Sequence, residues 1–157
     1  MAKNKLKNIV YSVLFLAVIG GLFAWPIITD KNRPLVKAWN QAGIGCLSSM
    51  VKVAKHEHAN LTITVDGVKE SFDRDLGIVR NCMGEFHVHT GQPGILHLET
   101  VSPSEIFKLS HFFVVYDKPL VREGYKLEVI MNGAHVNDPV NLELADKQVI
   151  ELKYTKE

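Results

Sequence analysis

Residues 82–99 read CMGEFHVHTGQPGILHLE and carry the densest chemical pattern in the chain. Residues 86–90 and 95–100 have the composition of strands, and the Gly-Gln-Pro-Gly segment between them is typical of a turn. Side chains two residues apart on a strand lie on the same face of a sheet. His87 and His89 are therefore predicted to point the same way.

A second histidine pair, His56-Glu-His58, precedes a predicted strand at residues 61–65. Two His-x-His pairs in one small domain, with a further histidine downstream, predict a transition-metal site. Neutral imidazole binds both copper and zinc well, and the pattern does not separate the two ions. The alternative is that the histidines are exposed strand residues or hydrogen-bonded core residues. The predicted metal ligands are His56, His58, His87, His89 and His97.

Three carboxylates lie close to these histidines in the sequence, namely Glu57, Glu85 and Glu99. A carboxylate can bind the metal itself, or it can accept an imidazole N–H and so orient the ring. The sequence does not choose among the three.

The two cysteines, Cys46 and Cys82, each lie shortly before a histidine pair. In an extracytoplasmic domain they are predicted to form a disulfide. The bond would close a loop of about 37 residues and stabilise the fold by roughly 3–4 kcal/mol in the chain-entropy view. The alternative is that both are thiolate ligands of the metal.

The rest of the chain predicts an α+β fold, a small mixed β-sheet with one main helix. Asp66-Gly67 and Asn132-Gly133 are hairpin turn sequences. Ser102 begins a capping box, with Pro at the next position and Glu at the third, so a helix is predicted from there to residue 116. The alternating pattern of residues 148–154 predicts a closing strand with one buried face.

Residues 9–28 form an uncharged apolar run that follows three lysines. A helix of about 20 residues spans the roughly 30 Å hydrocarbon core of a bilayer, so a single transmembrane helix with a cytoplasmic N-terminus is predicted. A cleaved signal peptide and a buried helix are the alternatives. The predicted organisation is a membrane anchor at 1–30, a stalk at 31–55 and an extracytoplasmic α+β domain at 56–157.

The formal net charge of +1 leaves no basic surface of the kind that binds nucleic acid. No phosphate-binding glycine loop and no Ser/His/Asp signature accompanies the histidines. The sequence therefore favours a protein that is not an enzyme, although it does not decide the question.

The pattern HEHANLTITVDG (56–67), then CM (82–83), FHVH (86–89) and GILHLE (94–99), resembles an uncharacterised family of membrane-anchored prokaryotic domains. The resemblance runs from Cys46 to the C-terminal strand and implies a small extracytoplasmic domain with a metal site, without implying an activity. The chain departs from that family at Thr90, where a carboxylate often follows the second histidine pair. The C-terminal half also resembles β-grasp domains.

These observations predict a membrane-anchored, extracytoplasmic domain that binds copper or zinc, with the lipid bilayer as a partner through residues 9–28. One alternative is a non-catalytic accessory subunit of a membrane complex that binds a membrane-protein partner and no metal. A lesser alternative is a cupin-like metal-dependent enzyme. The cupin pattern needs a Glu a few residues after His89, and here the next carboxylate is Glu99.

Overall fold

The structure is a computed structural model that describes residues 11–21, 33–47, 51–72, 75–80 and 82–157. The chain divides into two compact units, Met1–Arg33 and Pro34–Glu157.

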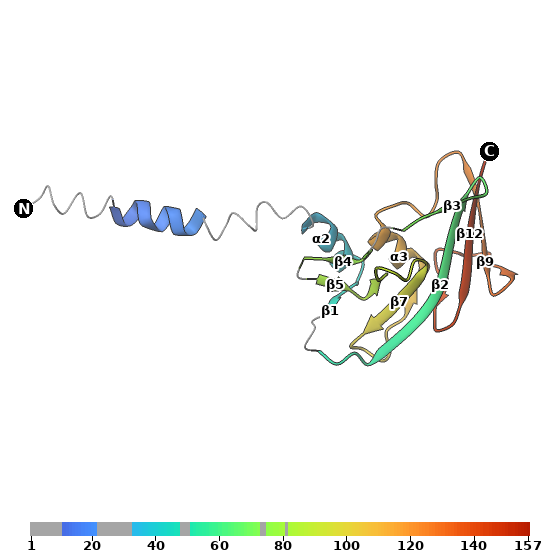
Figure 1. Ribbon diagram of the computed structural model, residues 1–157, viewed down its shortest axis with the longest axis horizontal. Helices are drawn as coiled ribbons and strands as arrows, with labels where there is room; N and C mark the ends of the chain where they lie inside the picture. The colour runs from blue at the N-terminus through green and yellow to red at the C-terminus, as the bar shows by residue number, and fades with distance from the viewer. Residues whose placement is uncertain (1–10, 22–32, 48–50, 73–74, 81) are drawn as a thin grey trace, which may run out of the picture. The chain divides into compact units, whose positions relative to one another are not determined.

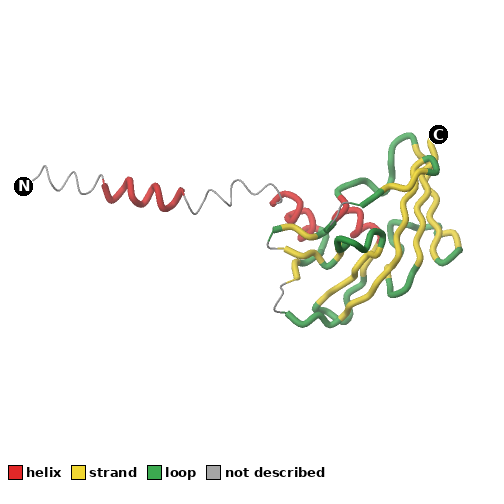
Figure 2. Tube along the Cα trace, in the orientation of Figure 1, coloured by secondary structure: helices red, strands yellow, loops and turns green. Residues whose placement is uncertain are grey.

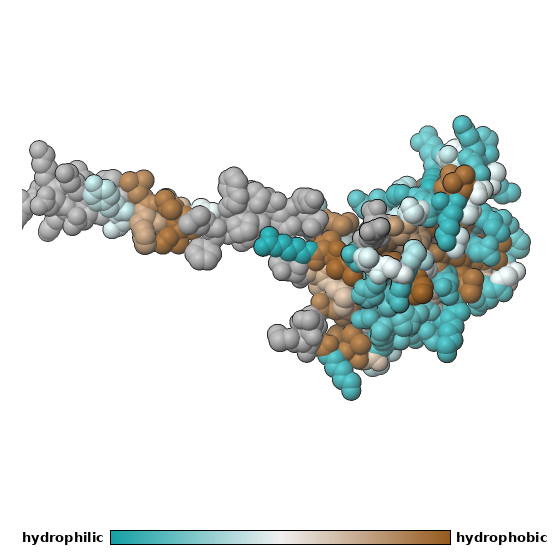
Figure 3. Space-filling view, viewed as in Figure 1, coloured by the Kyte–Doolittle hydropathy of each residue, from teal (hydrophilic) through white to brown (hydrophobic). Residues whose placement is uncertain are grey.

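The first unit contains a helix at residues 11–21, whose side chains are nearly all exposed. Hydrophobic residues gather on this helix in Figure 3. These helical residues rise about 16 Å, roughly half of a bilayer's hydrocarbon core. In the described part of the chain, no helix is both long and apolar enough to cross a membrane. The prediction of a transmembrane helix over 9–28 is therefore corrected, and residues 9, 10 and 22–28 of that range lie outside the described residues.

A mixed sheet of seven strands forms the body of the second unit (Figures 1 and 2). The hydrogen-bonded order is β10-β9-β12-β2-β7-β6, and β3 pairs with β2. β12 and β2 are parallel, and the other pairs are antiparallel. The strands are β2 (Lys55–Val65), β3 (Val68–Glu70), β6 (Phe86–His87), β7 (Ile95–Thr100), β9 (Tyr125–Met131), β10 (Ala134–His135) and β12 (Val149–Lys156).

The long strand β2 joins the two halves of this sheet. Its first part, residues 55–60, pairs with β7, and its second part, residues 60–65, pairs with β12. Ala59, Leu61 and Ile63 alternate along β2 and are almost fully buried. This period of two fixes which face of β2 points to the core, and the histidines of its first part therefore point to the other face.

Two predicted hairpin turns are confirmed. Asp66 and Gly67 both have positive φ, at 49° and 80°, and connect β2 to β3. Asn132 and Gly133 do the same between β9 and β10, with φ of 51° and 83°. Two successive residues with positive φ characterise the type I′ turn, whose twist matches that of antiparallel strands.

Helices and short strands complete the second unit. α2 (Arg33–Gln41) and α3 (Leu109–Tyr116) both contribute to the hydrophobic core. Trp39 of α2 is fully buried, so much of the predicted stalk at 31–55 belongs to the same compact unit as the sheet. Two smaller sheets contain β1 (Cys46–Leu47), β5 (Cys82–Gly84) and β4 (Ile78–Val79), and β11 (Glu143–Leu144) with β8 (Phe107–Lys108).

The predicted fold class needs correction beyond the transmembrane helix. The described residues contain three short helices, and most of the ordered structure is sheet. The helix predicted from Ser102 begins only at Leu109, and its N-cap, Lys108, makes no side-chain capping bond. Phe107 is buried and pairs with Leu144, so tertiary strand pairing replaces the first turns that the capping box predicts.

The carboxylate of Glu70, on β3, is held by two cations and one hydroxyl group. Glu70 accepts hydrogen bonds from Tyr116, Lys118 and Arg122. Burial raises the pKa of Glu70, but the bonds from Lys118, Arg122 and Tyr116 outweigh it and lower the pKa from 4.5 to about 2. The network joins β3 to α3 and to the loop that follows it.

We expect Glu70→Gln to destabilise the protein by about 2–3 kcal/mol at pH 7, from a shift worth about 1.4 kcal/mol per pKa unit. Because the pKa is depressed in the folded state, this stabilisation is present above pH 4.5 and is lost as the pH falls toward 2. Urea denaturation of both proteins at pH 7 and at pH 3 measures the effect. The difference between them should shrink at pH 3, and a difference that is independent of pH would contradict the charge argument.

Candidate metal centre

Three neighbouring strands bring the predicted ligands together. His58 on β2 lies opposite His97 on β7, and His97 lies opposite His87 on β6. His56 lies opposite Glu99. Side chains directly opposite each other on one face are in contact range. The structure thus gathers all five predicted ligands, called here the histidine cluster: His56, His58, His87, His89 and His97.

The other face of these three strands is hydrophobic core. Phe86 on β6 and Leu98 on β7 are fully buried and lie opposite each other. Leu96 of β7 faces Ala59 of β2, and both are also buried. The apolar residues alternate with the histidines, so burial of one set holds the other set on the opposite face.

The ring nitrogens of the cluster are spaced like ligands of one metal ion. His56 Nε2 lies 3.3 Å from His97 Nδ1, and His87 Nε2 lies 3.2 Å from His89 Nε2. In a tetrahedral zinc site with bonds of about 2.0–2.1 Å, neighbouring ligand atoms are about 3.3 Å apart. The imidazoles could therefore bind an ion with little movement.

The cluster divides into two groups that share one residue. The outer group is His56, His58 and His97, and the inner group is His87, His89 and His97. Within each group the ligand atoms lie within 4.8 Å of one another, so each could hold a metal ion. The side chains of His56 and His58 are exposed, whereas His87 is fully buried.

The tautomer of His87 is set by a backbone carbonyl. Its Nδ1 lies 2.9 Å from the carbonyl oxygen of Gly84. A carbonyl only accepts, so Nδ1 carries the proton and donates. The Nε2 lone pair then faces the cluster. Such a bond to the far ring nitrogen orients metal-binding histidines in general.

His97 is oriented in a similar way by Gln92, for which the sequence predicts only a place in a turn. His97 Nε2 lies 3.0 Å from Gln92 Oε1. With Nε2 as the donor, Nδ1 presents its lone pair toward His56 and Glu99. Burial, followed by the neighbouring imidazoles of His87 and His58, lowers the pKa of His97 to about 4. Burial also lowers the pKa of His87. Both rings are neutral at pH 7, as metal binding requires.

Of the three candidate carboxylates, only Glu99 joins the cluster. Its Oε1 lies 3.1 Å from His56 Nε2, 3.8 Å from His87 Nε2 and 3.9 Å from His97 Nδ1. Glu85 instead accepts the backbone N–H of Gly45 at 2.8 Å. Glu57 has its nearest cation, Lys55, at 3.9 Å, and it lies on the core side of β2 by strand alternation.

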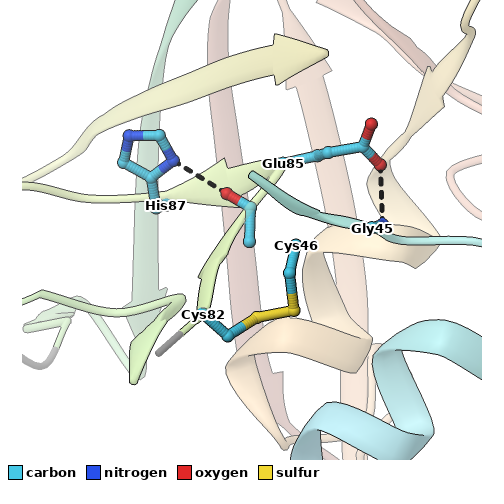
Figure 4. The surroundings of a disulfide bond; sticks show 6 residues. Gly45, Cys46, Cys82, Glu85 and His87 are labelled. Atoms are coloured by element: carbon cyan, nitrogen blue, oxygen red, sulfur yellow. Dashed lines mark hydrogen bonds between the residues drawn. A yellow bond between two sulfur atoms is a disulfide. The ribbon is translucent and has the colours of Figure 1, made fainter. Parts of the chain in front are cut away.

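The predicted disulfide between Cys46 and Cys82 is confirmed. It joins β1 to β5, and Cys46 pairs in register with Gly84 (Figure 4). Figure 4 shows the hydrogen bond from His87 to the backbone oxygen of Gly84, near the disulfide. The covalent bond therefore anchors the segment that orients an inner ligand. It also removes both thiolates from the possible metal ligands.

Gly77 lets the backbone lie directly against His87. A Cβ at position 77 would lie 2.1 Å from the Phe86 carbonyl oxygen and 2.9 Å from the His87 Cα. Its φ of +80° is in the left-handed region, which glycine adopts at little cost. This close approach helps to bury His87.

We expect Gly77→Ala to destabilise the protein by about 2–4 kcal/mol, because backbone atoms cannot move aside for the added methyl group. Gly91→Ala is the matched control. Gly91 has a similar φ of +89°, but a Cβ added there would meet nothing within 4 Å. The control should lose only about 1 kcal/mol through backbone strain. Equal losses in urea denaturation would contradict the close-contact explanation.

The two remaining histidines, His111 and His135, lie outside the cluster. His111 packs edge-on against Phe86 at 6.0 Å between ring centroids. His135 is exposed and lies 3.2 Å from Glu128. His135 is thus a suitable control position for metal-binding experiments.

Comparison with known protein families, with curated proteins and with solved structures gives no match to this chain. The resemblance to a family of membrane-anchored domains therefore stays a prediction.

Proposed function

We propose that this protein is an extracytoplasmic domain that binds a transition-metal ion, copper or zinc, through its histidine cluster. The observation that carries the proposal is the convergence of five imidazoles and Glu99, which come from three adjacent strands and, for His89, from the segment that follows β6. Two of the imidazoles have tautomers that aim a lone pair into the cluster. Without an ion, these two lone pairs accept N–H groups of neighbouring rings, since His89 Nε2 lies 3.2 Å from His87 Nε2 and His56 Nε2 lies 3.3 Å from His97 Nδ1. A metal ion would take the place of these protons.

The chemistry of the ligand set suits both ions. Imidazole nitrogen is a good ligand for Cu(II) and Zn(II), and a single carboxylate is compatible with either. A hard cation such as calcium or magnesium would need mainly oxygen ligands, and among the described residues Glu99 alone has a carboxylate oxygen within 4.0 Å of the ring nitrogens of the cluster.

A location outside the cytoplasm is supported by the disulfide. Disulfides persist in oxidising compartments and are rare where thioredoxin and glutathione keep thiols reduced. Cys46 and Cys82 are bonded to each other, and no free cysteine is found among the described residues.

Zinc titration of the full chain, purified without a histidine tag, tests the proposal. We expect stoichiometric binding and a rise in the melting temperature, since a ligand at 100 times its Kd stabilises a fold by about 2.7 kcal/mol. The His87→Ala/His89→Ala double variant should lose most of this rise, and His135→Ala should keep it. A wild-type melting temperature that is unchanged by zinc and by Cu(II) would overturn the proposal.

A further inference from the structure

The two groups of the histidine cluster differ in their access to solvent. The side chain of His56 is 45% exposed, and His58 is exposed as well. On the inner side, His87 is 0% exposed and His89 is half-buried. An ion that arrives from solvent therefore meets the outer imidazoles first.

Both groups depend on the same residue, His97. A neutral imidazole has one lone pair, because its other nitrogen carries the proton. In this structure that proton is on Nε2, which donates to Gln92. His97 can therefore complete the outer group or the inner group, but it serves one ion at a time.

Glu99 lies between the two groups. The same oxygen, Oε1, is 3.1 Å from His56 Nε2 in the outer group and 3.8 Å from His87 Nε2 in the inner group. A carboxylate in this place can remain a ligand while an ion exchanges one set of imidazoles for the other. Its negative charge also offsets the charge of the ion as the ion moves away from water.

We propose, on the premise of the metal-binding function above, that the cluster is a two-position relay for a single ion. His56 and His58 capture the ion at the surface, and the ion then passes by way of His97 and Glu99 to His87 and His89. The inner position retains the ion because His87 and His97 are buried and are oriented by the Gly84 carbonyl and by Gln92. The outer position sets how fast the ion is loaded and transferred to the inner position.

Zinc binding by the full chain distinguishes the two positions. One variant removes an outer ligand, His58→Ala, and the other removes an inner ligand, His89→Ala, with His135→Ala as control. Stopped-flow mixing measures the rate of loading, and excess chelator measures the rate of release. Stoichiometry is measured by elemental analysis.

We expect one zinc ion per chain in the wild type and in both variants. His58→Ala should slow loading and leave release close to the wild-type rate. His89→Ala should load normally and release zinc roughly 10- to 100-fold faster. Loss of a residue that merely hydrogen-bonds to a metal ligand already weakens a metal site on this scale. His135→Ala should match the wild type in both rates.

Two zinc ions per chain, or equal effects of the two variants on both rates, would overturn the relay while leaving metal binding intact. Failure of the wild type to bind zinc or Cu(II) would overturn the proposed function itself. The two failures are therefore distinguishable.

Discussion

Replacement of His97 by alanine is expected to weaken zinc binding by the full chain at least about 100-fold. Removal of a residue that only hydrogen-bonds to a metal ligand already costs up to about 100-fold. His97 belongs to both groups of the cluster, so neither group keeps three imidazoles without it. Its side chain is also central in space, with ring centroids 4.5 Å from His58 and 4.6 Å from His89. No other histidine belongs to both groups.

Isothermal titration with zinc measures the loss in affinity, and circular dichroism checks that the variant is folded. His97→Gln serves as a second variant that keeps most of the buried volume, in case the alanine variant unfolds. His56→Ala should cost less than either, because it removes an exposed ligand from one group only. If His97→Ala and His56→Ala weakened binding equally, His97 would not be the shared ligand.

Removal of the disulfide by a Cys46→Ala/Cys82→Ala double substitution is expected to destabilise the protein by about 4 kcal/mol. The two cysteines are 36 residues apart in the sequence, and the unfolded chain gains the entropy of that loop when the bond is absent. The bond also anchors β5, whose Gly84 carbonyl orients His87. The variant should therefore bind zinc more weakly as well as unfold more readily.

Urea denaturation in the absence of metal gives the loss in stability, and zinc titration under conditions where the variant is folded gives the change in affinity. For the stability measurement, the wild type treated with a reductant is the comparison that opens the bond without a substitution. A loss of stability below about 1 kcal/mol would show that the loop is already constrained in the unfolded chain. An affinity unchanged in the folded variant would show that Gly84 keeps its place without the bond.

Much of the histidine site is predictable because strand geometry is local. The His-x-His spacing alone places each pair on one face, and the alternating apolar residues decide which face that is. The pairing of strands far apart in the chain is not predictable in this way. His58 and His97 are neighbours only because β2 and β7 pair in one register. Strand alternation alone excludes Glu57, but the position of Glu99 opposite His56 depends on the same register.

The roles of Gln92 and Gly77 at the site are not predictable from the sequence, because they too depend on tertiary contacts. Gln92 lies in a Gly- and Pro-rich turn, where a polar residue needs no special explanation. Its contact with His97 depends on how that turn folds back over β7. Gly77 has no distinctive sequence context, and only the packing of its backbone against Phe86 and His87 shows why a side chain would not fit there.

The fold prediction is wrong where local patterns compete with tertiary contacts. The capping box at Ser102 is a sound local helix start, yet the buried pairing of Phe107 with Leu144 keeps that segment extended. Trp39 falls within the predicted stalk, yet it is fully buried, and Leu35, Val36 and Trp39 form one apolar helical face that packs on the core. Short helices and short strands contain few repeats of a periodic pattern, so tertiary packing determines whether such a segment is helical or extended.

X-ray absorption at the zinc edge of the zinc-loaded full chain tests the central claim most directly. We predict a first shell of nitrogen and oxygen at about 2.0–2.1 Å, with the outer-shell scattering typical of several imidazoles, and no sulfur at about 2.3 Å. A sulfur shell would mean that Cys46 and Cys82 act as thiolates, and a shell without imidazole scattering would mean that the histidine cluster does not bind the ion.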